Sequence, residues 1–258
     1  MKLEIKGVWA PLITPLFDGK FDKQSTLNLL QTLEPFVNGL APCLSSGEGA
    51  KMDRRLWEEV VGFIVQNTSK PVAAGILKDN LDDIISFTKR AKELGCSAVV
   101  VPMVGRTAEE KQDFAKKLSN QSHLPIIIYN TEKFPISDMA LLKKIVSSGN
   151  FIAIKDSSRN QSFFNQMIQA RKAGALDIFV LQGMDNQLLK SVGCDGYMIA
   201  LTNVEPQLCW NMFINPSKKL NDAILRRCDD LNLSKDQWYM YIKKAMLKNN
   251  RIKSAEVL

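Results

Sequence analysis

The chain of 258 residues is poor in the side chains that build metal sites. Its only histidine is His123, so no set of imidazole ligands can form within the chain. The five cysteines are scattered, with no C-x-x-C pair and no zinc spacing, and we expect them to be reduced thiols. We therefore expect no metal ion.

Long apolar runs and nucleotide-binding glycine motifs are also missing. No stretch reaches the roughly 18 consecutive apolar residues that a membrane span needs. Residues 1–6 contain no apolar signal core, so we do not expect secretion. Neither a G-x-G-x-x-G motif nor a P-loop is present. We therefore expect a cytoplasmic protein with no membrane partner and no cofactor.

Positive charge is in modest excess, with 34 Lys and Arg against 27 Asp and Glu. Much of the excess lies between Lys218 and Lys253, which contains ten basic residues. A basic region can bind nucleic acid, but here no nucleic-acid motif or interleaved aromatic side chains accompany the charge. We interpret this region as a solvated helix face and expect no nucleic-acid partner.

The chain does contain a regular alternation of short apolar segments with longer amphipathic ones. Several apolar segments, such as 99–101 and 126–128, have no polar position, which is typical of parallel strands buried on both faces. The expected strands cover residues 7–14, 39–46, 71–77, 96–103, 124–129, 151–155, 177–182 and 196–201.

Helices are expected between these strands. Asp53 is a predicted N-cap, Gly95 a helix stop, and Ser234 with Gln237 a capping box that begins the last helix. The expected helices cover residues 23–36, 54–66, 81–94, 108–118, 138–146, 161–173 and 186–192, and further helical segments complete the chain.

Eight strand–helix units predict an α/β fold, a (β/α)₈ TIM barrel over residues 1–205. Residues 206–258 are expected to form a short C-terminal helical extension. The alternative is an open, doubly wound sheet, which would normally carry a ligand signature at its switch point.

The active site of such a barrel lies at the C-terminal ends of its strands. Lys155 ends the apolar strand at 151–155, where burial disfavours the charged ammonium. A neutral amine is what attack on a ketone requires. The alternative is a lysine whose head reaches solvent. His123 precedes a strand, at the other end of the barrel, so it cannot complete a serine–histidine triad.

Two further strand ends carry reactive groups. Tyr129 could transfer protons beside Lys155, or be a core tyrosine with a satisfied hydroxyl. Ser45, Ser46 and Gly47 could present hydroxyl and backbone N–H groups to a carboxylate, or form a plain turn.

Taken together, these segments resemble the dihydrodipicolinate synthase / N-acetylneuraminate lyase family of class I aldolases. The similarity lies in their order and spacing over residues 7–210. It is carried by Thr14-Pro15, Ser45-Ser46-Gly47-Glu48, Tyr129-Asn130, Lys155-Asp156-Ser157-Ser158, Gly183-Met184-Asp185 and the segment 196–203.

The resemblance implies a role for each position. Lys155 would form a Schiff base with pyruvate or another 2-oxo acid, Tyr129 would shuttle protons, and Ser45 would hydrogen-bond Tyr129. The resemblance also implies a homo-oligomer, either a dimer or a tetramer. The substrate-binding positions would be Ser46, Gly47, Gly183, Asp185 and Met198.

Three departures from the family pattern leave the second substrate open. Residues 102–104 read Pro-Met-Val where the synthases carry Pro-Tyr-Tyr, and residues 131–134 contain no arginine after the Tyr-Asn motif. The C-terminal region is also short. Lys133 could replace the arginine only poorly, because it lacks the planar two-point contact.

These departures favour a pyruvate-dependent aldolase or lyase that acts on a 2-keto-3-deoxy sugar acid. One alternative is dihydrodipicolinate synthase of lysine biosynthesis, which condenses pyruvate with aspartate semialdehyde. The other is a non-catalytic homologue that binds a 2-oxo acid.

Overall fold

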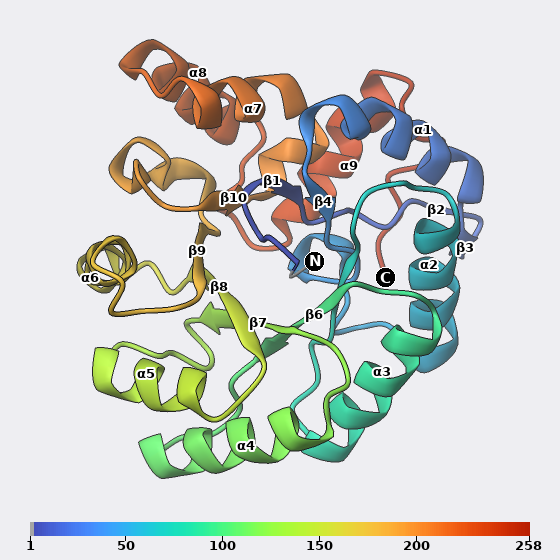
Figure 1. Ribbon diagram of the computed structural model, residues 1–258. Coiled ribbons are helices and arrows are strands. Elements are labelled where there is room, and N and C mark those ends of the chain that lie inside the picture. The colour runs from blue at the N-terminus through green and yellow to red at the C-terminus, as the bar shows by residue number, and fades with distance from the viewer. Residues whose placement is uncertain (1–2) are drawn as a thin grey trace.

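Eight parallel strands form a barrel with helices around it in the computed structural model, which describes residues 3–258 (Figure 1). The first and last strands of the row are joined by a parallel bridge between Leu40 and Val72, which closes the barrel. The predicted (β/α)₈ fold is confirmed. In their order around the barrel the strands are β4 (Gly39–Leu40), β1 (Gly7–Ala10), β10 (Gly196–Met198), β9 (Phe179–Gln182), β8 (Phe151–Ser157), β7 (Ile126–Thr131), β6 (Ala98–Pro102) and β5 (Ala73–Gly75).

The register of the central strands sets the level of the functional side chains. Tyr129 on β7 pairs with Lys155 on β8, and Lys155 pairs with Leu181 on β9. Residues at one level of parallel neighbouring strands point to the same face of the sheet. Tyr129 and Lys155 therefore lie side by side near the carboxyl ends of their strands.

A small hairpin follows β1 and is separate from the barrel sheet. Strands β2 (Leu16–Phe17) and β3 (Lys20–Phe21) pair antiparallel across Asp18 and Gly19, whose φ angles are 51° and 68°. An Asp-Gly pair with both φ angles positive suits the tight turn of a two-residue hairpin. The strand expected at residues 7–14 is shorter in the structure and ends at Ala10.

Most of the barrel helices begin at a side-chain cap. The Asp53 carboxylate accepts the Leu56 N–H at 2.8 Å, as predicted for this N-cap. The helices are α1 (Lys23–Leu33), α2 (Arg54–Gln66), α3 (Leu81–Glu93), α4 (Ala108–Gln121), α5 (Met139–Ser147), α6 (Gln161–Lys172) and α7 (Pro206–Ile214).

Two expected helices differ from the sequence pattern, one in length and one in type. Helix α1 ends at Leu33 and continues as a 3₁₀ turn, η1 (Glu34–Phe36), because Pro35 has no N–H to extend the α-helical hydrogen bonds. The expected helix at 186–192 is replaced by two 3₁₀ turns, η3 (Asp185–Gln187) and η4 (Leu189–Ser191).

The C-terminal region consists of α7, α8 (Lys218–Asp230) and α9 (Trp238–Lys248). Helix α7 packs against β1, while α9 packs against two 3₁₀ turns at the strand ends, η2 (Ser45–Gly47) and η5 (Ala200–Asn203). The boundary at residue 205 stays a prediction, and α7 covers the barrel wall although it lies beyond that boundary.

The predicted capping box at the start of the last helix is wrong. Helix α9 begins at Trp238, and Gln237 before it adopts a left-handed backbone with φ of 52°. No side chain caps this helix end. Ser234 instead lies in the turn between α8 and α9 and faces the cavity described below.

Within residues 3–258, none of the helices combines the length and apolar character needed to cross a bilayer. The five cysteines are free thiols, and all except the half-buried Cys194 are buried.

Candidate active site

A cavity of about 330 Å³ opens at the carboxyl ends of the barrel strands. Its lining includes residues 233–238, which comprise the end of the connection from α8 to α9 and the first residue of α9. Seven of the eight residues predicted from the sequence line this cavity, namely Ser45, Ser46, Tyr129, Lys155, Gly183, Asp185 and Met198.

Lys155 lies at the inner end of the cavity and is only 4% exposed. The preceding residues of β8, Phe151–Ile154, are all buried, so the strand carries the amine into the barrel rather than out to solvent. A side chain at Gly183 would place its Cβ 3.0 Å from Lys155 Cε and 2.7 Å from the Asp156 carbonyl oxygen. The glycine therefore leaves the space that the lysine occupies.

Tyr129 joins Lys155 to Ser45. The Lys155 Nζ lies 4.4 Å from the centre of the Tyr129 ring, and the Tyr129 and Ser45 hydroxyl oxygens are 3.1 Å apart. Burial raises the pKa of Tyr129, but the charge of Lys155 and hydrogen bonds with Ser45 and Ser157 outweigh it and lower the pKa overall. The lowered pKa suits the Tyr129 hydroxyl to donate a proton and to accept one in turn.

The turn η2 presents two hydroxyl side chains to the cavity. Ser46 is buried, and both Ser45 and Ser46 line the cavity, whereas Gly47 lies behind them. The Gly47 N–H donates to the Leu44 carbonyl at 3.0 Å, and a Cβ at Gly47 would come within 2.6 Å of the Leu12 carbonyl oxygen. Gly47 thus shapes the turn through its lack of a side chain.

Asp185 holds the loop after β10 in place. Its carboxylate accepts the Leu201 N–H at 2.7 Å, and η5 begins at the neighbouring Ala200. Burial raises the pKa of Asp185, and the hydrogen bonds from the backbone partly offset this effect. The residue is therefore a support for the cavity wall as well as part of it.

A buried pair behind the cavity was recognised from the sequence only as part of two motifs. The Asn130 amide donates to Asp156 at 2.6 Å and accepts the Ile136 N–H at 2.7 Å. Ser158 also donates to Asp156, at 2.9 Å. Burial raises the pKa of Asp156, and the hydrogen bonds from Ser158 and Asn130 offset only part of this rise. This pair ties β7 to β8 immediately beside Tyr129 and Lys155.

The mouth of the cavity carries charges that sequence reasoning had missed. Arg159 lies two residues beyond β8 and lines the cavity, with its Nε 3.6 Å from Glu132. Lys133, considered as a substitute for the missing arginine, forms an ion pair with Asp79 at 2.5 Å. Lys133 lines a neighbouring cavity of about 220 Å³ on another side of Tyr129. Lys133 therefore does not face Lys155.

Residues 3–258 contain no group of three or more His, Cys, Asp or Glu side chains arranged to hold a metal ion. His123 is exposed in the loop before β7, at the end of the barrel opposite the cavity.

Comparisons with known proteins agree with this geometry. A model of the dihydrodipicolinate synthetase family matches residues 4–248. The 4-hydroxy-tetrahydrodipicolinate synthase of Methanothrix thermoacetophila is 26% identical over 211 residues, which cover 78% of this chain and 71% of the relative.

Solved structures share the fold at low identity. A prophage protein of the dihydrodipicolinic acid synthase family from E. coli K12, solved with pyruvate, has a TM-score of 0.90 and 23% identity, covering 98% of this chain and 91% of its own. The 2-keto 3-deoxygluconate aldolase of Picrophilus torridus has a TM-score of 0.84 and 22% identity, covering 96% and 94%. The chain therefore belongs to the dihydrodipicolinate synthetase family, and it is an enzyme of the class I aldolase type, a carbon–carbon lyase.

Proposed function

We propose that Lys155 forms a Schiff base with the keto carbon of pyruvate and that the resulting enamine makes or breaks a carbon–carbon bond. The observation that carries the proposal is a buried lysine amine beside a tyrosine, at the inner end of a cavity lined by hydroxyl groups. Attack on a keto carbon requires the neutral amine, and the neighbouring Tyr129 hydroxyl can exchange protons during this step.

The residues of the cavity have separate roles in forming the Schiff base. Ser46 hydrogen-bonds the carboxylate of the 2-oxo acid, which brings carbon two to the Lys155 amine. Addition of the amine to the keto group gives a carbinolamine, and loss of water gives the imine. Tyr129 supplies the proton that leaves with the hydroxyl and exchanges protons with Ser45, 3.1 Å away.

Carbon–carbon chemistry follows from the imine. The protonated imine accepts electrons, so carbon three loses a proton and becomes an enamine nucleophile. Attack on an aldehyde carbon forms the new bond, with Tyr129 protonating the developing alkoxide. The reverse sequence cleaves an aldol, and hydrolysis of the imine frees Lys155 in both directions.

The names of the relatives favour aspartate semialdehyde as the second substrate. The curated relatives are named 4-hydroxy-tetrahydrodipicolinate synthase, so the synthase reaction has at least as much support as the sugar-acid reaction expected from the sequence. The second candidate, a 2-keto-3-deoxy sugar acid, rests on the absence of an arginine in residues 131–134 and on the name of the Picrophilus structure.

A pair of assays separates these candidates. Pyruvate and aspartate semialdehyde are supplied together with a coupling reductase that oxidises NADPH as product forms, and 2-keto-3-deoxy sugar acids are supplied separately with pyruvate release as the readout. We expect turnover in the first assay and its loss in Lys155→Ala. Turnover only on sugar acids would overturn the choice of acceptor, and pyruvate binding without turnover in either assay would support the non-catalytic homologue.

A further inference from the structure

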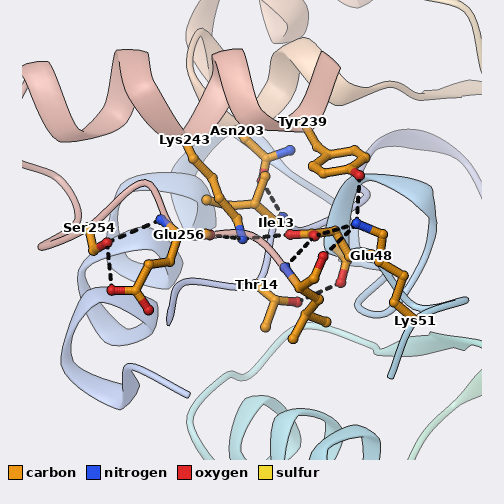
Figure 2. A network of polar contacts seen from close by, with 11 residues as sticks. Ile13, Thr14, Glu48, Lys51, Asn203, Tyr239, Lys243, Ser254 and Glu256 are labelled. Carbon is orange, nitrogen blue, oxygen red and sulfur yellow. Dashed lines mark hydrogen bonds and ion pairs between the residues drawn. The ribbon is translucent and has the colours of Figure 1, made fainter. Parts of the chain in front are cut away.

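A buried ion pair lies directly behind the turn that faces the substrate. Glu48 follows η2, with a left-handed backbone of φ 59°, and its carboxylate meets Lys243 of α9 at 2.6 Å. Both side chains are 0% exposed, although the two residues are 195 positions apart in the chain. Figure 2 shows the pair at the centre of a network that spans the C-terminal helix and the strand ends.

The remaining polar atoms of the pair are also engaged. The second Glu48 oxygen accepts the Leu258 N–H at 2.7 Å and lies 3.5 Å from the Lys51 ammonium. Lys243 also donates to the Glu256 carbonyl at 2.6 Å. Burial lowers the pKa of Lys243, and the contact with Glu48 opposes this effect. Hydrogen bonds therefore compensate both buried charges.

Such a pair is weak evidence for stability by itself. Desolvating two charges can cost as much as their attraction returns, and apolar side chains of similar volume often stabilise a fold equally well. The buried pair does fix two segments at one defined separation. The role of the Glu48–Lys243 pair therefore depends on what these two segments contribute to the cavity.

The two segments pack against each other and both contribute residues to the lining of the catalytic cavity. Glu48 is covalently next to the turn that carries Ser45 and Ser46, and α9 begins where Gln237 and Trp238 form part of the lining. The turn is also held from the barrel side, because the Thr14 hydroxyl donates to the Gly47 carbonyl at 3.0 Å (Figure 2).

We infer that Glu48 and Lys243 are positioning residues that hold the carboxylate-binding turn at Ser45–Gly47 against the C-terminal helix, so that α9 is part of the pyruvate site. The inference rests on the proposed function, since it assigns to this turn the carboxylate of the 2-oxo acid. It goes beyond that function by making helix α9 necessary for substrate affinity.

The test uses a double variant, because Lys243→Met alone would remove the nearest cation from the buried Glu48 carboxylate and could fail to fold. Glu48→Gln with Lys243→Met removes both charges and keeps the side-chain volumes. The matched control is Arg171→Met, which removes a half-buried ion pair with Asp195 at the opposite end of the barrel. Each protein is incubated with increasing pyruvate, reduced with borohydride, and scored for adduct.

We expect the pyruvate concentration for half-maximal trapping to rise by about tenfold or more in the double variant, since a small displacement of a positioning group is costly. We expect its melting temperature to stay close to that of the wild type, and the control to trap like the wild type. An unchanged pyruvate dependence in the folded double variant would overturn the inference.

Amide hydrogen exchange provides a second readout that does not depend on pyruvate. The double variant should exchange faster than the wild type and the control in peptides covering 44–49 and 233–238, and nowhere else on the strand ends. If the wild type trapped no pyruvate, the proposed function would fail while the exchange measurement still decided the positioning role. Unchanged exchange in both peptides would refute that role.

Discussion

Tyr129 lies beside both the Lys155 side chain and the Ser45 hydroxyl, a position suited to proton transfer. Tyr129→Phe keeps the ring and removes only the hydroxyl, so we expect turnover to fall by about 10²- to 10³-fold with the fold intact. Tyr197→Phe is the control, because Tyr197 is a buried tyrosine that packs against Phe213 outside the cavity. Steady-state kinetics with both variants would check this, and equal losses would contradict a special role for Tyr129.

Asp156 gives the stability of the fold a defined pH dependence. Burial raises its pKa above the ordinary value of 3.8, so the folded state holds this proton more tightly than the unfolded chain. Its contribution to stability therefore falls as the pH rises from about 3.8 through the raised pKa. In Asp156→Asn this loss disappears, so the variant should gain in stability relative to the wild type between pH 4 and pH 7.

Urea unfolding at several pH values measures that difference. Glu110→Gln is the control of opposite sign, because hydrogen bonds from the Arg106 and Thr107 amides lower the pKa of Glu110. This variant should lose stability relative to the wild type over the same pH range. A flat difference for Asp156→Asn would show that the carboxyl is not held in its protonated form by the fold.

Residue by residue, the sequence locates a polar side chain best where it follows an apolar strand, while the catalytic role of such a side chain stays a prediction. Lys155 and Tyr129 were found this way, and the structure places both in one cavity. Glu48 and Lys243 could not be paired from the sequence, because no pattern links a turn residue to a helix residue 195 positions away. Arg159 was missed because it lies past the strand end, in a loop with no apolar periodicity.

At the scale of elements, the close approach of β8 and β9 depends on Gly183. Gly183→Ala would place a methyl group 3.0 Å from Lys155 Cε and 2.7 Å from the Asp156 carbonyl oxygen. Overpacking of this kind costs about 1–3 kcal/mol in unfolding free energy and should displace the amine. We expect a strong loss of turnover in this variant.

The control for this change is Gly174→Ala in the loop after α6. A Cβ at Gly174 meets no atom within 4 Å, although its φ of 70° makes the substitution strained. It should lose some stability and keep its activity, which kinetics and thermal melting would show. Full activity in Gly183→Ala would mean that the lysine does not need this space.

The ends of the strands and helices are where the local sequence pattern and the tertiary structure disagree. The apolar segments located the strands, but hydrogen-bonded pairing with the neighbouring strands stops before the predicted end of several of them, as in β1 at Ala10. Proline chemistry explains the short α1. The capping box at Ser234 and Gln237 failed because the connection from α8 to α9 bends into the cavity mouth, and this packing overrides the local signal.

For the whole molecule, eight repeats of strand and helix were enough to predict a closed barrel. The closing contact itself, between Leu40 and Val72, is a single bridge that no local pattern could reveal. The acceptor could not be derived either, since it depends on mouth residues brought together from β7, β8 and the segment 233–238. The cytoplasmic location stays a prediction.

The predicted homo-oligomer is also a property of the whole molecule. A chain of 29.0 kDa should sediment at two or four times this mass if the resemblance extends to assembly. Exposed apolar side chains on the described surface, including Val192 and Ile214, are available for contacts between subunits. Sedimentation velocity at micromolar concentration measures the mass directly, and a single 29.0 kDa species would contradict the prediction.

The central claim is that Lys155 bonds covalently to pyruvate. The most direct measurement is to incubate the protein with pyruvate, reduce with borohydride, digest, and analyse the peptides by mass spectrometry. Lys155→Ala serves as the control for trapping at other lysines. The account predicts a pyruvate-derived adduct on the Lys155 peptide and none in the variant. No adduct on Lys155 with pyruvate in large excess would contradict it.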